Sequence, residues 1–296
     1  MLLIIAKTGQ PIDGSLLLSA TFRTDLVPVP ASLEFTTKSS AQLDTALVVG
    51  AEVLVGESSL SMTLVRVQPL KTQTIKDGSR VGGLACIAVL SGCLRLIDPI
   101  NRAVILQAAT IGGAMRACGA SLAFDGDLSI AQFVCLKGQL PTVELAKRLQ
   151  QEAAVILLSG GRLSAVRIDA LMTSEPVARF DPSSVVWIDS PVVTALSTPS
   201  FVSVAADGST IEGEQTSDCR PVCYYPKMNE RQLKNMQKVL ICRGVMTRPL
   251  DHSLQAGRVI WVGERRLVVL TAAHRTDTGA IGGNASHVSK VWLASL

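Results

Sequence analysis

The sequence predicts a β-rich α+β protein in which two small β-barrel domains flank a mixed α/β insert. Short apolar runs separated by turn residues recur in the first and last parts of the 296-residue chain, a pattern typical of barrels or sandwiches. Between them, residues 141–168 show helical periodicity followed at once by a hairpin pattern. We therefore expect a first β-barrel domain at 1–97, the insert at 98–175, and a second β-barrel-containing domain at 176–296.

The first domain is predicted from its strands and turns. The expected strands lie at 16–22, 33–35, 53–55, 60–67 and 81–90. Pro28 and Pro30 precede the second of these, which predicts either an edge strand or a strand that begins just after the prolines. Asp77-Gly78 is a hairpin signal, because this dipeptide suits the positive φ angles of a tight turn.

The insert begins with a helix and a strand. Thr110 can cap a helix over 110–118, and Gly119 suits the backbone turn that follows a helix. A returning strand is expected at 130–136.

A second helix and a hairpin complete the insert. Thr142 is the expected N-cap, with Pro141 just outside the helix. The predicted buried stripe consists of Leu145, Leu149 and Ala153, widened by Val143 and Ala146. The turn Ser159-Gly160-Gly161 then predicts a hairpin between 155–158 and 163–168.

The last domain is predicted to consist of strands with one short helix. Asp207-Gly208 and Gly263-Glu264 are expected hairpin turns. Asn229 and Gln232 have the spacing of a capping box at the start of a helix. Residues 287–296 alternate in polarity and are expected to end the chain as a strand. This domain resembles the first only loosely.

Composition limits the class of protein. The chain is 48% hydrophobic but only 4% aromatic, so either its core is aliphatic or an oligomer covers apolar surface. Its seven cysteines are odd in number and scattered, which favours reduced thiols in a cytosolic compartment. We expect no signal peptide and no membrane insertion, because residues 1–6 are too short an apolar run. Residues 218–296 carry a net charge of +7 and the rest −3, which indicates a solvated face or a surface for a polyanion or protein partner.

Candidate sites for metals and catalysis were sought and none is predicted. Cys219 and Cys223, with Cys242 and His252 further on, have looser spacing than a zinc knuckle, so ordinary thiols are favoured. His274 is expected at a strand end against a loop, with general acid–base catalysis as the alternative.

The remaining polar motifs are also weak. Asp125 and Asp127 flank a glycine, which favours a turn over a pair of catalytic carboxylates. Residues 159–162 and 279–283 lack the pattern of a phosphate-binding loop. Tyr224-Tyr225 is the one aromatic cluster suited to stacking on a ligand. We therefore predict no enzyme activity, no catalytic, cofactor-binding or metal-binding residue, and no cofactor.

The order of segments resembles the tail baseplate hub family of bacteriophages, which is related to late-control protein D and to the hub part of type VI secretion spikes. The segments that carry this resemblance are DLVPVPASLEF (25–35), AVILQAATIGGAMRACGASLAF (103–124), FVCLKGQLPTVELAKRLQQEAAVILLSGGRLSAVRI (133–168), LQAGRVIWVGERRLVVLTAAHR (254–275) and the terminal SKVWLASL. The segment at 133–168 is the most similar, because hubs place a strand, a helix, a strand, a glycine turn and a strand in this order.

The resemblance implies a structural virion protein. It would be a homotrimer in which each chain supplies two tail-tube-like barrels, so that three chains form a pseudo-sixfold ring joining the tail tube to the spike or tail tip. The implied partners are the hexameric tail tube or distal tail protein, the spike or tail-tip protein, and the tape-measure protein, with DNA passing through the lumen without specific binding. The location would be the virion tail baseplate, after assembly in the bacterial host cytoplasm. The alternatives are a tail-associated receptor- or glycan-binding module and a cell-wall hydrolase.

Overall fold

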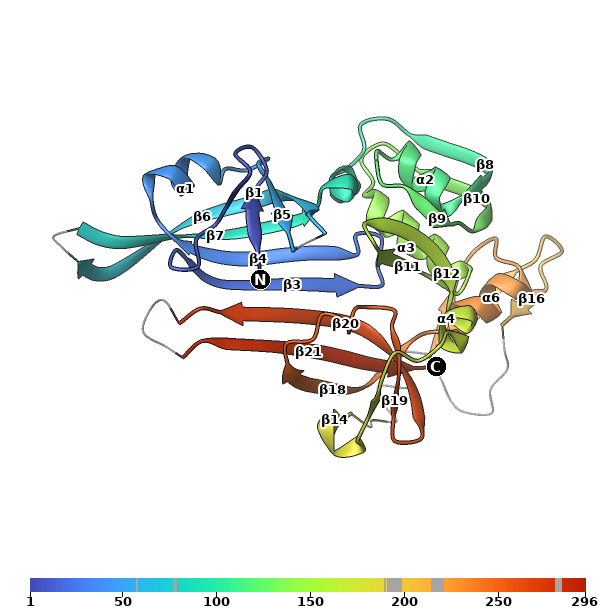
Figure 1. Ribbon diagram of the computed structural model, residues 1–296. Helices are drawn as coiled ribbons and strands as arrows, with labels where there is room; N and C mark the ends of the chain where they lie inside the picture. The colour runs from blue at the N-terminus through green and yellow to red at the C-terminus, as the bar shows by residue number, and fades with distance from the viewer. Residues whose placement is uncertain (57, 77–78, 189, 191–198, 214–220, 280–283) are drawn as a thin grey trace.

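The computed structural model describes residues 1–56, 58–76, 79–188, 190, 199–213, 221–279 and 284–296, with side chains described outside 71–81. Thirteen of the described strands form one curled, mostly antiparallel sheet that runs through both β-rich parts of the chain (Figure 1). The order along the sheet is β14-β18-β21-β20-β3-β4-β7-β6-β5-β1-β2, with β19 beside β20 and β13 beside β19.

The N-terminal part supplies one half of this sheet. Its elements are β1 (Leu3–Ile5), β2 (Gln10–Pro11), β3 (Leu17–Asp25), β4 (Ala31–Lys38), α1 (Ala41–Ala46), β5 (Glu52–Val55), β6 (Leu60–Lys76) and β7 (Ser79–Leu90). β4 starts directly after Pro30 and pairs with both β3 and β7, so it is an inner strand that begins after the prolines. β6 and β7 pair antiparallel up to Lys76 opposite Ser79, and the turn expected at Asp77-Gly78 lies outside the described part of the chain.

The insert packs beside the first half of the sheet. Its elements are η1 (Ser91–Ile97), β8 (Val104–Thr110), α2 (Ile111–Ala117), β9 (Phe124–Gly126), β10 (Ser129–Cys135), α3 (Pro141–Gln151), β11 (Ala154–Ser159), β12 (Arg162–Arg167) and α4 (Ile168–Thr173). The cap of α2 is confirmed, because the Thr110 side chain accepts a hydrogen bond from the backbone of Gly113, and Gly119 has φ +103°. The β11–β12 hairpin is also confirmed, with Gly160 and Gly161 at positive φ.

Two expectations about α3 were wrong. Pro141 is the first residue of the helix, and Leu140 occupies the N-cap position without a side-chain hydrogen bond, so Thr142 is not the cap. Proline suits the first helical position because the backbone N–H that it lacks has no partner there. Leu145 and Leu149 are buried as predicted, but Val143 is 45% exposed. Ala146 is exposed as well, so the buried stripe is narrower than the periodicity indicated.

The C-terminal part supplies the other half of the sheet and a small separate module. Its elements are β13 (Arg179–Phe180), η2 (Pro182–Ser184), β14 (Val185–Trp187), β15 (Ser200–Val204), β16 (Thr210–Glu212), β17 (Val222–Tyr224), α6 (Glu230–Gln237), β18 (Ile241–Pro249), β19 (Val259–Val262), β20 (Arg265–Asp277) and β21 (Ser286–Ser295). β15, β16 and β17 pack on α6 around a core of their own formed by Phe201, Leu233 and Met236. The β15–β16 hairpin, the β19–β20 hairpin and the capping box at Asn229 are confirmed.

The two β-rich parts join through β3 and β20, which pair antiparallel from Asp25 opposite Thr271 to Ser19 opposite Asp277. The β-rich α+β class is therefore confirmed, and both parts share one open, curled sheet. Two closed barrels, and the domain boundaries at 97 and 175, stay predictions. None of the described helices is long and apolar enough to cross a bilayer.

Candidate functional surface

Both halves of the sheet repeat the same strand order. We call β3-β4-β7-β6, with β5 beside β6, the first unit. We call β14-β18-β21-β20, with β19 beside β20, the second unit. In the first unit, β3 and β4 lie beside the later hairpin β6–β7, and in the second, β14 and β18 lie beside the later hairpin β20–β21. A short strand pairs with the start of one hairpin strand in each unit: β5 with β6, and β19 with β20. The units follow one another along the sheet in the same direction, as successive segments of a tube wall would.

The repeat extends to single hydrogen bonds. Gly50 and Gly257 both have φ +88°, and each donates a backbone hydrogen bond of 2.8 Å, to Leu64 in the first unit and to Val269 in the second. A β-bulge follows each acceptor, between Leu64 and Arg66 and between Val269 and Thr271. Because a bulge inserts one residue and re-aims the strand, matching bulges indicate that both units bend at the same place.

The repeat is also visible in one short segment of the sequence. Residues 50–57 are GAEVLVGE and residues 257–264 are GRVIWVGE, which share the glycine of positive φ, the apolar alternation and the following Gly-Glu. The similar segment is short and the two units otherwise differ in sequence. The sequence therefore predicted only a loose resemblance between the first and last domains.

Each unit has one strand edge to which a neighbouring unit can pair. Beyond its bulge, β20 pairs with β3 of the first unit. The corresponding edge of β6 pairs with none of the described strands, and neither does the outer edge of β14. Both edges carry exposed apolar side chains, namely Leu70 at 37% exposure and Val186 at 74%. Such edges are ready to pair with another chain.

The two faces of the shared sheet differ. Strand alternation places one set of side chains toward the core, including Leu33, Phe35, Ala272, Val291 and Leu293, all of which are buried. The other set mixes polar side chains with apolar ones, among them Ile87, Val288 and Trp292. The charged residues that strand alternation places on this face include Arg23, Asp25, Glu34, Lys38, Glu52, Arg66, Arg275, Asp277 and Lys290. We call this the bare face.

Charge on the bare face is nearly balanced. These five cations and four acids leave a net charge of +1 among them. Arg23 pairs with Asp25 at 2.7 Å and Arg275 pairs with Asp277 at 2.8 Å, so each pair is satisfied within its own strand. The cationic excess of the C-terminal part therefore lies elsewhere.

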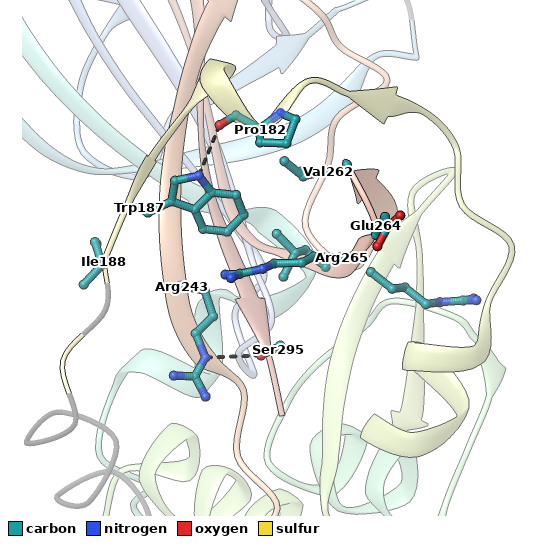
Figure 2. A pocket seen from close by; sticks show the side chains of 11 residues that line it. Pro182, Trp187, Ile188, Arg243, Val262, Glu264, Arg265 and Ser295 are labelled. Atoms are coloured by element: carbon teal, nitrogen blue, oxygen red, sulfur yellow. Dashed lines mark hydrogen bonds between the residues drawn. The ribbon is translucent and has the colours of Figure 1, made fainter.

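A group of the C-terminal arginines gathers around a cavity at the end of the second unit (Figure 2). The cavity has a volume of about 1060 Å³. Trp187, Arg243 and Arg265 line it, and the Trp187 indole donates a hydrogen bond to the carbonyl of Pro182 at 3.1 Å. The guanidinium carbon of Arg265 lies 4.8 Å from the centre of the Trp187 ring, which is a cation–π contact.

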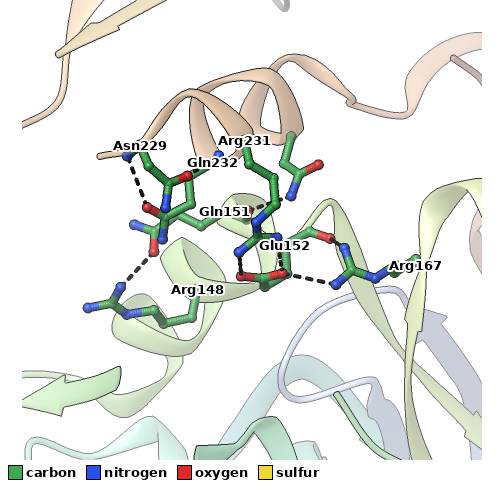
Figure 3. Close-up of polar contacts among 8 residues, drawn as sticks. Arg148, Gln151, Glu152, Arg167, Asn229, Arg231 and Gln232 are labelled. Carbon is green, nitrogen blue, oxygen red and sulfur yellow. Dashed lines mark hydrogen bonds and ion pairs between the residues drawn. The ribbon is translucent and has the colours of Figure 1, made fainter. Parts of the chain in front are cut away.

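A buried carboxylate fixes the small α6 module to the insert (Figure 3). Glu152, at the end of α3, accepts hydrogen bonds from Arg231 of α6 at 2.8 and 2.9 Å and from Arg167 of β12 at 3.1 Å. Burial opposes ionisation of Glu152, but the hydrogen bonds and charges of the two arginines outweigh burial and lower its pKa. Asn235 adds a bond to the carbonyl of Gln151.

His274 lies inside β20 rather than at a strand end, so that expectation was wrong in placement. It is 1% exposed, its Nδ1 is 2.8 Å from the Ser289 hydroxyl, and its ring packs 5.0 Å from that of His252. Burial, followed by the nearby His252, lowers the pKa of His274 to about 4. A buried neutral ring of this kind is out of reach of a substrate.

The other weighed residues are separated. Asp125 pairs with Arg162, whereas Asp127 accepts hydrogen bonds from the backbone of Gly112 and Leu128, so the two carboxylates face different partners. Tyr224 is exposed, and Tyr225 packs on Phe201.

The structure describes only some of the residues that were weighed as metal ligands. Cys219 lies outside the described residues, as do residues 280–283 of the glycine-rich loop. Cys223 and Cys242 have free thiols. Among the residues that the structure describes, no three potential ligands gather around a common point.

Comparison with known proteins gives structural likeness without sequence likeness. No protein-family model and no curated protein sequence matches the chain. A tail protein from Neisseria meningitidis MC58 is similar in structure, with a TM-score of 0.68 and 11% identity over 99% of this chain and 95% of that one. The 43 kDa tail protein of prophage MuSo2 from Shewanella oneidensis has a TM-score of 0.64 and 9% identity over 99% and 96% of the two chains.

The similarity extends to a type VI secretion component. An E. coli protein described as similar to the T4 tail proteins gp27 and gp5 has a TM-score of 0.57 and 9% identity, over 99% of this chain and 76% of that one. The segment order, the curled sheet and these solved structures agree: the chain has the fold of the phage tail proteins and of the related type VI spike proteins.

Proposed function

We propose that the chain is the hub of a phage-type tail, a structural protein that forms a trimeric, pseudo-sixfold ring between the tail tube and the spike or tail tip. The observation that carries this proposal is the repeat of two equivalent units, side by side in one curled sheet. Three chains would place six such units around an axis. The same ring would match a hexameric tube on one side and a trimeric spike on the other.

The bare face would line the lumen of this ring. It carries both polar and apolar side chains, is continuous across both units and is nearly neutral, which suits a surface past which the tape-measure protein and DNA move without being held. DNA binding by proteins depends mainly on cations that neutralise phosphates, and here two arginines of the face, Arg23 and Arg275, are paired with acids of the same strand.

The repeat also supports one way in which the proposed ring would close. Within the chain, Arg275 of β20 lies opposite Thr21 of β3. The pairing registers place Leu70 of β6 at the position of Arg275, and Val186 of β14 at that of Thr21. If the contact between chains copies the contact within the chain, Leu70 of one protomer lies opposite Val186 of its neighbour. Two exposed apolar side chains would then cover each other.

Cysteine cross-linking tests this closure. The double variant Leu70→Cys/Val186→Cys should form covalent dimers and trimers on mild oxidation, seen on a non-reducing gel. The pair Thr21→Cys/Arg275→Cys is the internal reference, because it samples the same strand geometry inside one chain. Each single variant, and the distant pair Leu70→Cys/Lys290→Cys, control for the seven native cysteines.

The native mass of the purified chain at several concentrations tests the ring itself. A trimer, with a central channel in electron micrographs, is the expected result. A trimer that oxidises only in the reference pair would reject the β6–β14 register and keep the ring. A monomer at every concentration, with no cross-link between chains, would reject the ring as an assembly of this chain alone.

A further inference from the structure

We propose that the cavity beneath Trp187 binds a carboxylate-bearing segment of a partner protein. Figure 2 shows Arg265 extending away from Glu264 toward Trp187, whereas the guanidinium group of Arg243 points away from Arg265, and its Nε donates a hydrogen bond of 3.2 Å to the Ser295 hydroxyl. Arg265 is therefore the cation that faces the Trp187 ring. An oxyanion beside it would accept charge-assisted hydrogen bonds from its guanidinium group, the stronger class of hydrogen bond in proteins.

The side chain of Arg265 is already held in a position that suits such a ligand. Among the described residues, the interaction found for its guanidinium group is the stack on the Trp187 ring, with no ion pair or side-chain hydrogen bond. A guanidinium held flat against an aromatic ring keeps its N–H edge free and loses little further side-chain freedom on binding a carboxylate in bidentate fashion. The indole edge and the exposed Ile188 offer apolar contacts for the stem of an acidic side chain.

The repeat supplies an internal comparison. The first unit has a cavity at the equivalent place, where Phe22 stands for Trp187, Val55 for Val262 and Leu60 for Arg265. That cavity is apolar in these positions, and the chain's own β11–β12 turn, Gly160-Gly161, lines it together with Met1. At the second unit none of the described segments takes the place of this turn. The cavity is therefore lined by the chain's own turn at the first unit and by arginine side chains at the second.

The position of the cavity favours a protein over a nucleic acid. Strand alternation puts Trp187 on the side of the sheet opposite to the bare face, in line with Leu293 and Phe22. A nucleic acid that passes along the bare face does not reach Arg265. This step rests on the proposed function, since it takes the bare face as the lumen; a ring of three copies would then present three such cavities on its outer side.

Nuclear magnetic resonance of the full chain tests the proposal. The chain has three tryptophans, so three indole N–H signals are expected, and Trp187→Phe identifies the one of interest. The probe is the capped peptide acetyl-Thr-Val-Glu-Val-Thr-amide, titrated to millimolar concentration. We expect a saturable shift of the Trp187 signal alone. The same peptide with Gln in place of Glu should bind at least about tenfold more weakly, because it lacks the charge.

Variants make the test specific. Arg265→Gln should weaken binding by at least about tenfold, with the Trp261 and Trp292 signals unchanged as evidence of an intact fold. Arg258→Gln removes an exposed cation of the same part of the chain outside the cavity, and it should bind the peptide as the parent does.

Three results would overturn the proposal. One is the absence of any Trp187 shift with the Glu peptide. Another is an equal shift with inorganic phosphate or with a DNA duplex, which would make the cavity a general anion site. The third is equal binding of the Gln peptide. None of these results depends on whether the chain trimerises, so failure of this proposal is distinct from failure of the ring.

Discussion

At the residue scale, the buried His274 makes stability depend on pH. Its pKa is lowered to about 4 in the folded chain by burial and by His252, while an unfolded histidine titrates near its ordinary value of about 6.5. Between these two values the unfolded state binds the extra proton, so stability falls as pH falls through this window.

The expected size of this effect is measurable. The free energy of unfolding should drop by about 2 kcal/mol between pH 7 and pH 5 through His274 alone. Urea unfolding of the parent and of His274→Gln at both pH values measures it, and the variant should lose most of the pH dependence. The exposed His287 is the matched control, and His287→Gln should keep the parental dependence. Equal pH dependence in all three chains would contradict a buried neutral His274.

The negative charge of Glu152 also contributes to the stability of the fold. Its carboxylate is nearly covered, and its removal as Glu152→Gln leaves Arg231 and Arg167 without their common partner. Because both arginines are about half exposed, water recovers part of the loss, and we expect a cost of about 1–3 kcal/mol rather than more. Hydrogen exchange should show the loss at α6 first.

The control for Glu152→Gln is a change at Glu230, which lies on α6 together with Arg231. Glu230 forms an exposed i,i+4 pair with Lys234, and because water screens this pair, Glu230→Gln should leave stability nearly unchanged. Faster exchange spread evenly over the whole chain in Glu152→Gln would show that this carboxylate does more than hold the α6 module in place.

At the element scale, the orientation of α3 can be tested with one residue on each side. Leu145 is fully buried between the helix and the insert core, so Leu145→Asp places a charge without a partner there and should cost several kcal/mol. Val143→Asp, on the exposed side of the same helix, should cost less than about 1 kcal/mol. Circular dichroism with thermal unfolding compares the two, and similar losses would mean that the helix is rotated from the position described.

The elements show what the sequence could and could not reveal. Caps and hairpin turns were predictable because their signals are local: Thr110, Asn229 and the Gly160-Gly161 turn act within a few residues of themselves. The start of α3 was misplaced because Pro141 and Thr142 both suit a helix start, and the choice between them depends on packing. The β3–β20 pairing joins residues 246 positions apart, as in the hydrogen bond from Thr271 to Asp25, and no local pattern specifies it.

At the scale of the whole molecule, the near-neutral bare face predicts weak retention of DNA. The parent chain should not retard a 30-base-pair duplex in a gel at about 150 mM salt. Removing two paired acids, as in Asp25→Asn/Asp277→Asn, raises the charge of the face and frees Arg23 and Arg275. Binding that falls steeply with salt should then appear, because freed cations release counterions from the phosphates.

Acids away from the face provide the comparison. Asp13→Asn/Asp207→Asn changes the net charge of the chain equally at two exposed turns, and it should leave the duplex unretarded. Retardation by this control would mean that total charge, and not the pairing of charges on the bare face, decides whether DNA is held.

The strand edges of β6 and β14, which no described strand covers, have a consequence for how copies of the chain could assemble. A chain with one unfilled edge at each end is a directional link, and identical links join either into a closed loop or into an endless helix, depending only on the turn between successive links. In the proposed ring, the curvature per unit would be set by the paired bulges after Leu64 and Val269, and it would limit the assembly to a fixed size. A substitution that straightens one bulge would then be expected to convert the ring into filaments of no defined length.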